Sequence, residues 1–249
     1  MDHRRERELF LTFLIATHFA TAAVLFLIYR RDWGRIFSGI LRSIRLRNIA
    51  PDPDAKLGWL LVVGTVPAGI VGILFQKQVQ RIFARPVYVA SFLALNGVLL
   101  YAAELMKTRS KSGGDRGADD RIAMEISWRQ SAGVGLMQVL ALLPGFSRTG
   151  ATIAGGLMVG LPHEDALRFS FLLATPIIAA AAALKLPMLL ASRNAPAIEA
   201  AAIGASCAAI ASYLSVKFLT SYFRTRTLTP FAVYCLLAGS VSIALLLAR

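Results

Sequence analysis

Four polar side chains that could bind an anion lie together in a segment that carries almost no charge. Arg148 is the only charged residue within 131–162. Three hydroxyl groups lie close to it in the sequence, those of Ser147, Thr149 and Thr152. A guanidinium group forms paired hydrogen bonds to phosphate oxygens, which suits it to hold a phosphate group. The spacing therefore predicts an anion site around Arg148.

The segment that carries this site is too long for one helix across a membrane. A straight helix from Gln130 to His163 would be about 51 Å long, whereas the hydrocarbon core of a bilayer is about 30 Å thick. Pro144 and Gly145 interrupt it near the middle. Proline breaks a helix and glycine permits a turn. We therefore predict a re-entrant helical hairpin over 131–161 that enters and leaves on the cytoplasmic side, with the arms Ser131–Leu143 and Ala151–Leu161.

The tip of this hairpin would lie near the middle of the bilayer, because the arms would be about 20 Å and 16 Å long. Irregular backbone at that depth is tolerated only inside protein or beside a water-filled cavity. The free N–H groups of the second arm would point at this cavity. The alternative is a kinked helix whose Arg148 reaches the surface or pairs with a carboxylate. An arginine near the bilayer centre is costly and usually functional, so we favour the anion site.

The composition indicates that the rest of the chain is also embedded in a membrane. Hydrophobic residues make up 56% and charged residues 16% of the 249 residues, and the mean hydropathy is +0.60. Uncharged runs of about 20 residues are long enough to span a bilayer as helices. We predict an all-α, polytopic protein with about six spanning helices, at Leu9–Tyr29, Leu57–Phe75, Pro86–Ala103, Arg168–Leu190, Ala197–Thr220 and Thr227–Ala248.

The net charge of +13 could suggest a nucleic-acid partner, but the basic residues lie between the apolar runs. Segments 30–56 and 107–130 carry seven and six Lys or Arg residues, whereas segment 76–86 carries three. Positive charge gathers in cytoplasmic loops, so this bias places 30–56 and 107–130 in the cytoplasm and the N-terminus outside. No nucleic-acid-binding motif accompanies the charge, and nucleic-acid binding is not expected.

Two short matches indicate an internal repeat. Residues 12–17 (Thr-Phe-Leu-Ile-Ala-Thr) align with 170–175 (Ser-Phe-Leu-Leu-Ala-Thr), and 85–89 align with 229–233. The charge-derived topology gives the two halves opposite orientations, as in inverted-repeat membrane proteins. Chance similarity between apolar helices is the alternative. We predict a first repeat at 1–106, a cytoplasmic linker at 107–130 and a second repeat at 131–249.

One stretch is specific enough to indicate a family. Pro144–Thr152 (Pro-Gly-Phe-Ser-Arg-Thr-Gly-Ala-Thr) resembles the second signature of undecaprenyl-diphosphate phosphatases, Pro-Gly-x-Ser-Arg-Ser-x-x-Thr. The similarity extends through Gln138–Leu143 and Arg168–Leu173, and more weakly along nearly the whole chain. Thr149 stands where the family usually has serine, and it keeps the hydroxyl group.

The resemblance implies a phosphatase of the bacterial cytoplasmic (inner) membrane that converts undecaprenyl diphosphate into the monophosphate lipid carrier for cell-wall synthesis. Arg148 would hold the diphosphate and offset the charge of the transition state. Ser147 would be a hydrogen-bond donor or the nucleophile. The other residues implied at the substrate are Gln138, Gly145, Thr149 and Thr152. The resemblance leaves a divalent cation open, although the sequence contains no metal-binding pattern, and it is compatible with a homodimer.

The first signature of that family, with paired carboxylates and a Pro-x-Ser-Ser turn, has no match here. The internal repeat places the partner of the 131–161 hairpin before Met1. We therefore expect that this hairpin and the general base that it would carry lie outside residues 1–249. On this expectation, the chain alone inserts into membranes but hydrolyses little substrate. A catalytically inactive, truncated paralogue is one alternative, and a transporter or flippase for an anionic lipid is another, since translocation needs no base.

His18 lies in the middle of a predicted span, where a histidine is a candidate functional residue. It could contact the substrate, or it could be a neutral imidazole bonded to Thr17, to Thr21 or to a neighbouring helix. The two cysteines, Cys207 and Cys235, both fall in predicted spans and are expected to be packing residues.

Overall fold

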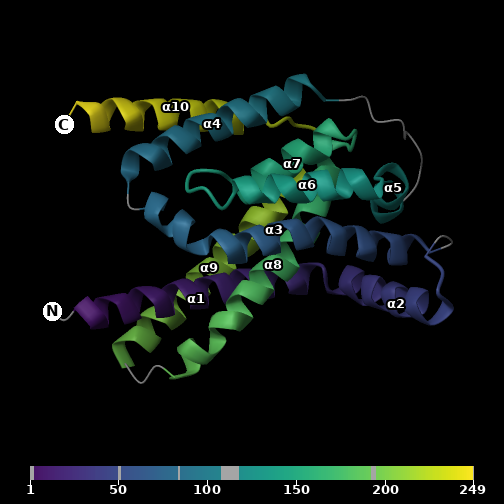
Figure 1. Cartoon of the computed structure of the whole chain (residues 1–249), viewed down its shortest axis with the longest axis horizontal. Coiled ribbons are helices and arrows are strands. Elements are labelled where there is room, and N and C mark those ends of the chain that lie inside the picture. The colour runs from purple at the N-terminus through teal and green to yellow at the C-terminus, as the bar shows by residue number, and fades with distance from the viewer. Residues whose placement is uncertain (1–2, 50–51, 84, 108–117, 192–194, 249) are drawn as a thin grey trace. The chain divides into compact units, whose positions relative to one another are not determined.

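The computed structural model describes residues 3–49, 52–83, 85–107, 118–191 and 195–248. These residues form ten α-helices and no strand, which confirms the all-α prediction (Figure 1). The helices are α1 (His3–Ile28), α2 (Arg30–Leu46), α3 (Pro53–Phe83), α4 (Pro86–Leu105), α5 (Ala118–Glu125), α6 (Trp128–Leu140), α7 (Arg148–Met158), α8 (His163–Ala191), α9 (Ala195–Tyr222) and α10 (Thr229–Leu247).

Five of the described helices contain apolar stretches long enough to cross a bilayer: Pro53–Phe75, Pro86–Leu105, His163–Leu184, Ile198–Tyr222 and Thr229–Leu247. A sixth candidate joins Thr12–Ile28 to Arg30–Leu46, which pass the same test only together. The protein is therefore a multi-pass membrane protein, and the prediction of about six spans is confirmed.

The chain forms two compact units, and each contains segments from both halves of the sequence. The first unit comprises 1–34 and 174–221, and the second comprises 35–173 and 222–249. This division follows contacts rather than internal symmetry, so the repeats at 1–106 and 131–249 remain a prediction. Part of the predicted linker, 108–117, lies outside the described residues, and α5 occupies 118–125 of it.

The predicted hairpin is present as α6 and α7, which pack against each other with the turn at Pro144 and Gly145 between them. Gly145 has a φ of 107°, a conformation that glycine adopts readily. Both helices begin three residues earlier than predicted because a serine caps each one. Ser127 forms a capping box with Gln130 at the start of α6. Helices of 13 and 11 residues are too short to span a bilayer.

The first arm of the hairpin packs closely on α3. The Ser131 hydroxyl donates to the Leu60 carbonyl at 2.6 Å, and Gln138 Nε2 donates to the Gly64 carbonyl at 3.2 Å. Between these bonds, Gly135 faces the backbone of Gly64, and a Cβ atom at position 135 would lie 2.6 Å from the Gly64 Cα. The absence of a side chain at position 135 therefore allows the two backbones to meet.

Acidic residues join α5 and α8 at one end of the second unit. Asp119 of α5 accepts hydrogen bonds from Arg35 of α2 and from Arg168 of α8, each at 2.6 Å. Arg121 donates two hydrogen bonds to Asp165, at 2.8 and 2.7 Å. These contacts bring segments from 30–56 and 107–130 to the same end of the unit, which supports the prediction that both face the cytoplasm.

We expect Asp165→Asn to destabilise the protein. Asp165 is fully buried, and its carboxylate pairs with Arg121, whose side chain is only 20% exposed. Removing one partner leaves the other charge poorly compensated, so the free energy of unfolding should fall by roughly 3 kcal/mol. Thermal unfolding in detergent measures this loss.

The neighbouring Glu164 provides a matched control. Its Oε1 atom lies 3.4 Å from the Nε atom of Arg224, and both side chains are exposed. Glu164→Gln should therefore change the free energy of unfolding by less than about 0.5 kcal/mol. Equal losses in the Asp165 and Glu164 variants would contradict the importance of the buried pair.

Candidate functional site

The N-terminus of α7 forms the centre of the candidate site. Ser147 is the N-cap residue with φ −81° and ψ 122°, and its Oγ accepts a hydrogen bond from the Gly150 N–H at 3.1 Å. Serine favours this position because its oxygen satisfies an N–H group that has no partner inside the helix. The remaining N–H groups and the positive end of the helix dipole make this turn suitable for an anion.

Arg148 follows directly as the first residue of α7. Its Nη1 atom is buried and has no hydrogen-bond partner. The part of the chain that the structure describes provides no ion pair for Arg148, so pairing with a carboxylate does not explain this residue there. A buried guanidinium without a partner is costly. This arrangement therefore favours an anion site over a purely structural arginine.

Gln138 is buried in α6 with 2% of its surface exposed. Its Nε2 donates to Gly64, and its Oε1 atom is buried without a partner. An amide oxygen is an acceptor, so Oε1 suits a water molecule or a protonated phosphate oxygen rather than an ionised one. Gln138 therefore adds a second unsatisfied polar group to the hairpin.

Thr152 connects α7 to α8. Its hydroxyl donates to the carbonyls of Arg148 and Thr149 at 2.9 and 3.1 Å, and it also forms a hydrogen bond with the Ser170 hydroxyl. These bonds already occupy the Thr152 side chain, so it would have to rotate to contact a phosphate. Sequence reasoning did not predict Ser170 as a partner, although Ser170 begins one of the repeat matches.

Helix α4 lies against the turn between α6 and α7. The ring of Phe92 lies 6.0 Å from that of Phe146, and a Cβ atom on Gly145 would lie 2.8 Å from the Leu93 nitrogen. Asn96 accepts a hydrogen bond from the Ser147 N–H at 3.2 Å. We did not predict Asn96, although an asparagine inside an uncharged span was a signal that could have identified it.

His18 belongs to the first unit, whereas Arg148 belongs to the second. Its Nδ1 atom lies 2.8 Å from the Leu14 carbonyl, one turn earlier in the same helix. The alternative role of a neutral imidazole bonded to Thr17, to Thr21 or to a neighbouring helix stays open, and the hydroxyls of Thr17 and Thr21 both donate to backbone carbonyls of α1. A substrate-binding role for His18 remains a prediction.

The residues gathered here do not form a good cation site. Among the described residues, no group of three His, Cys, Asp or Glu side chains is close enough together to hold a metal ion. The candidate site offers hydroxyl and amide groups with no carboxylate in contact with Arg148, whereas Mg²⁺ and Ca²⁺ favour carboxylate ligands. We therefore assign no step to a metal.

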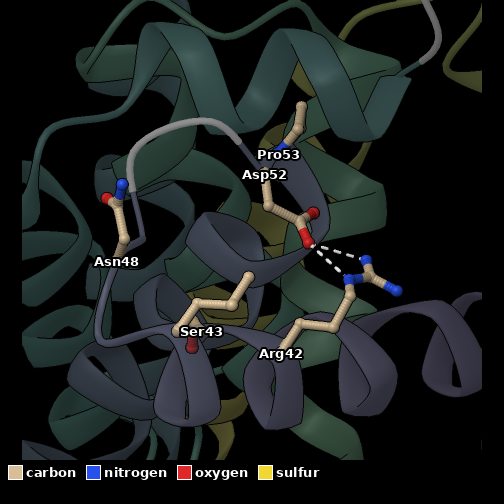
Figure 2. Close-up of a pocket in the computed structure, with 6 residues that line it drawn as sticks. Arg42, Ser43, Asn48, Asp52 and Pro53 are labelled. Atoms are coloured by element: carbon tan, nitrogen blue, oxygen red, sulfur yellow. Dashed lines mark hydrogen bonds and ion pairs between the residues drawn. The ribbon is translucent and has the colours of Figure 1, made fainter.

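A pocket of about 550 Å³ lies between the end of α2 and the start of α3 (Figure 2). Arg42 Nε and Nη2 donate to one oxygen of Asp52 at 2.9 and 2.6 Å. Burial raises the pKa of Asp52, but the bonds from Arg42 and from backbone N–H groups of α3 outweigh this effect, and the net pKa is below its usual value. The charge of Arg42 is therefore balanced by the Asp52 carboxylate. Arg148 differs, because its Nη1 atom has no hydrogen-bond partner.

The apolar helices define a polytopic α-helical membrane protein, and the hairpin turn carries the half-buried Arg148. The chain belongs to the family described as Bacitracin resistance protein BacA, whose model matches residues 1–241. It is 44% identical to the Undecaprenyl-diphosphatase of Mycolicibacterium paratuberculosis, over 98% of this chain and 83% of that protein. It is 38% identical to Undecaprenyl-diphosphatase 2 of Frankia alni, over 93% and 81% of the two chains. It is also 40% identical to Undecaprenyl-diphosphatase 2 of Chromobacterium violaceum, over 94% of this chain and 82% of that protein.

Proposed function

We propose that this protein is a phosphatase of the bacterial cytoplasmic membrane that hydrolyses undecaprenyl diphosphate to undecaprenyl phosphate and inorganic phosphate. Membership of the BacA family and the names of three relatives support this activity. The observation that carries the assignment to a site is the buried, unpaired Nη1 atom of Arg148 at the start of α7. Such a group is suited to the terminal phosphate of a lipid diphosphate.

In this proposal a water molecule attacks the terminal phosphorus. A new P–O bond forms as the P–O–P bond breaks, the lipid phosphate leaves, and the water gives up a proton to the surrounding solvent. Negative charge grows on the bridging and terminal oxygens as the bond breaks. Arg148 and the first N–H groups of α7 stabilise this charge more strongly in the transition state than in the ground state. The substrate's polyprenyl chain would remain among the apolar helices and the surrounding lipid.

Ser147 acts as a hydrogen-bond donor in this proposal rather than as the nucleophile. Its Oγ atom already accepts the Gly150 N–H, and this bond lowers the electron density available for attack on phosphorus. Its hydroxyl proton can still be donated to a phosphate oxygen. We assign no general base to the residues of the hairpin formed by α6 and α7.

Two direct readouts test the proposed function. Expression in a bacterial host should raise resistance to bacitracin, and membranes from those cells should release inorganic phosphate from undecaprenyl diphosphate faster than membranes from cells with an empty vector. Arg148→Gln should abolish both effects, because the neutral amide removes the charge that balances the phosphate. Binding of the lipid diphosphate without any phosphate release would overturn the phosphatase assignment and favour a transporter of anionic lipid.

A further inference from the structure

One face of α4 supports the turn that carries the candidate site. Contacts with the turn come from Phe92, Leu93 and Asn96, and Leu100 lies 3.1 Å from the position of a Cβ atom on Gly150. The spacing of these α4 residues corresponds to one side of a helix. The adjacent side of α4 packs on α10, where Gly97 and Gly239 permit close approach (Figure 1).

Asn96 is the polar residue of this face, and it is fully buried. Its Oδ1 atom accepts the Ser147 N–H at 3.2 Å, and its Nδ2 atom donates to the Sγ atom of Cys235 in α10 at 3.3 Å. Asn96 is thus the acceptor in its bond to the turn and the donor in its bond to α10. The oxygen of the Asn96 amide is therefore bonded to the turn, and its nitrogen is bonded to α10.

The bond to Ser147 acts at the residue where the backbone changes from turn to helix. Ser147 itself is exposed, but its N–H group bonds the buried Asn96 and has no partner within α7. A backbone N–H group left without an acceptor in a membrane protein is unfavourable. Without Asn96, the turn would have to shift to find another acceptor. Such a shift would move both the Ser147 hydroxyl and the start of the Arg148 side chain, which follows it directly in the chain.

We propose that Asn96 is a positioning residue that holds the Ser147–Arg148 turn in the geometry needed to stabilise the transition state. This inference rests on the proposed phosphatase function for its kinetic consequences. It differs from a purely structural role, in which Asn96 would only join α4 to α10 through Cys235. The positioning role depends on the Oδ1 atom of Asn96, whereas the structural role depends on its Nδ2 atom. Variants that remove one bond at a time can therefore separate the two roles.

Three variants distinguish them. Asn96→Leu keeps a similar volume but removes the acceptor for Ser147, and Asn96→Asp retains an acceptor oxygen. Cys235→Ala is the matched control, because it removes the partner of Nδ2 and leaves the bond to Ser147 intact. We expect kcat for phosphate release from undecaprenyl diphosphate to fall about 10- to 100-fold in Asn96→Leu, with KM changed less than threefold. Cys235→Ala should retain kcat within about threefold, and Asn96→Asp should recover at least part of the loss.

Hydrogen exchange provides a readout that does not require turnover. The Ser147 amide should exchange at least about tenfold faster in Asn96→Leu than in the wild-type protein or in Cys235→Ala. If the wild-type protein releases no phosphate, the phosphatase proposal fails, and the exchange measurement still tests the position of the turn. Unchanged exchange at Ser147, or equal loss of kcat in Asn96→Leu and Cys235→Ala, would overturn the positioning role.

Discussion

Arg148→Lys should lower phosphate release from undecaprenyl diphosphate by about 100-fold or more, even though the positive charge is kept. The planar guanidinium group can bond two phosphate oxygens at once, whereas an ammonium group is a single compact charge. Arg148 has a buried nitrogen with no protein partner, so little else in the described structure holds this side chain. The loss should therefore appear in catalysis rather than in folding, and steady-state kinetics together with thermal unfolding would separate the two.

The exposed Arg129 of α6 is the matched control. Arg129→Lys changes the same chemical group in the same hairpin, but at a position without a role in the proposed site, and it should leave the rate within about twofold of the wild-type rate. Near-normal hydrolysis by Arg148→Lys would show that a paired hydrogen bond to phosphate is not needed. A loss of folded protein in Arg148→Lys would instead indicate a structural role.

Gly135→Ala should prevent the hairpin from docking on α3. The added Cβ atom would overlap the Gly64 carbonyl and lie 2.6 Å from the Gly64 Cα, and backbone atoms cannot move aside as a flexible side chain can. Separating the two helices would also strain the bonds from Ser131 to Leu60 and from Gln138 to Gly64. We expect a loss of about 3 kcal/mol or more in the free energy of unfolding, together with loss of activity.

Gly133→Ala tests whether this effect belongs to the close approach. Gly133 lies two residues earlier in α6, and a Cβ atom there would have no neighbour within 4 Å. Alanine favours a helix over glycine, so this variant should be as stable as the wild-type protein or more stable by up to about 1 kcal/mol. The comparison uses yield and thermal unfolding in detergent. Similar behaviour of the two variants would contradict the tight contact between α3 and α6.

The hairpin could be predicted from sequence because its determinants are local. Pro144 and Gly145 interrupt the helix, and Arg148 stands alone in an uncharged stretch. The apolar runs predicted the spanning helices for the same reason, since hydropathy is a property of consecutive residues. The start of α7 was predicted three residues too late, because the capping role of Ser147 depends on a single hydrogen bond that the apolar pattern does not reveal.

The partners of the site residues were decided by tertiary structure. Asn96 bonds a residue 51 positions away, and Gln138 bonds Gly64 across 74 positions. Such contacts depend on which helices are neighbours and on how they are rotated about their axes. A single sequence specifies this only through the combined packing of the whole chain.

The role of each hydroxyl group was also decided by folding. Ser147, Thr149 and Thr152 are equivalent as residue types, and the sequence predicted all three as phosphate ligands. In the structure, Ser147 caps α7 while Thr152 bonds Ser170 in α8. A hydroxyl group both donates and accepts, so its chemistry depends on the groups that the fold places around it. The composition and spacing of the chain predicted an anion site at the hairpin turn, and helix packing determined which polar groups there have protein partners and which, such as Arg148 Nη1, have none.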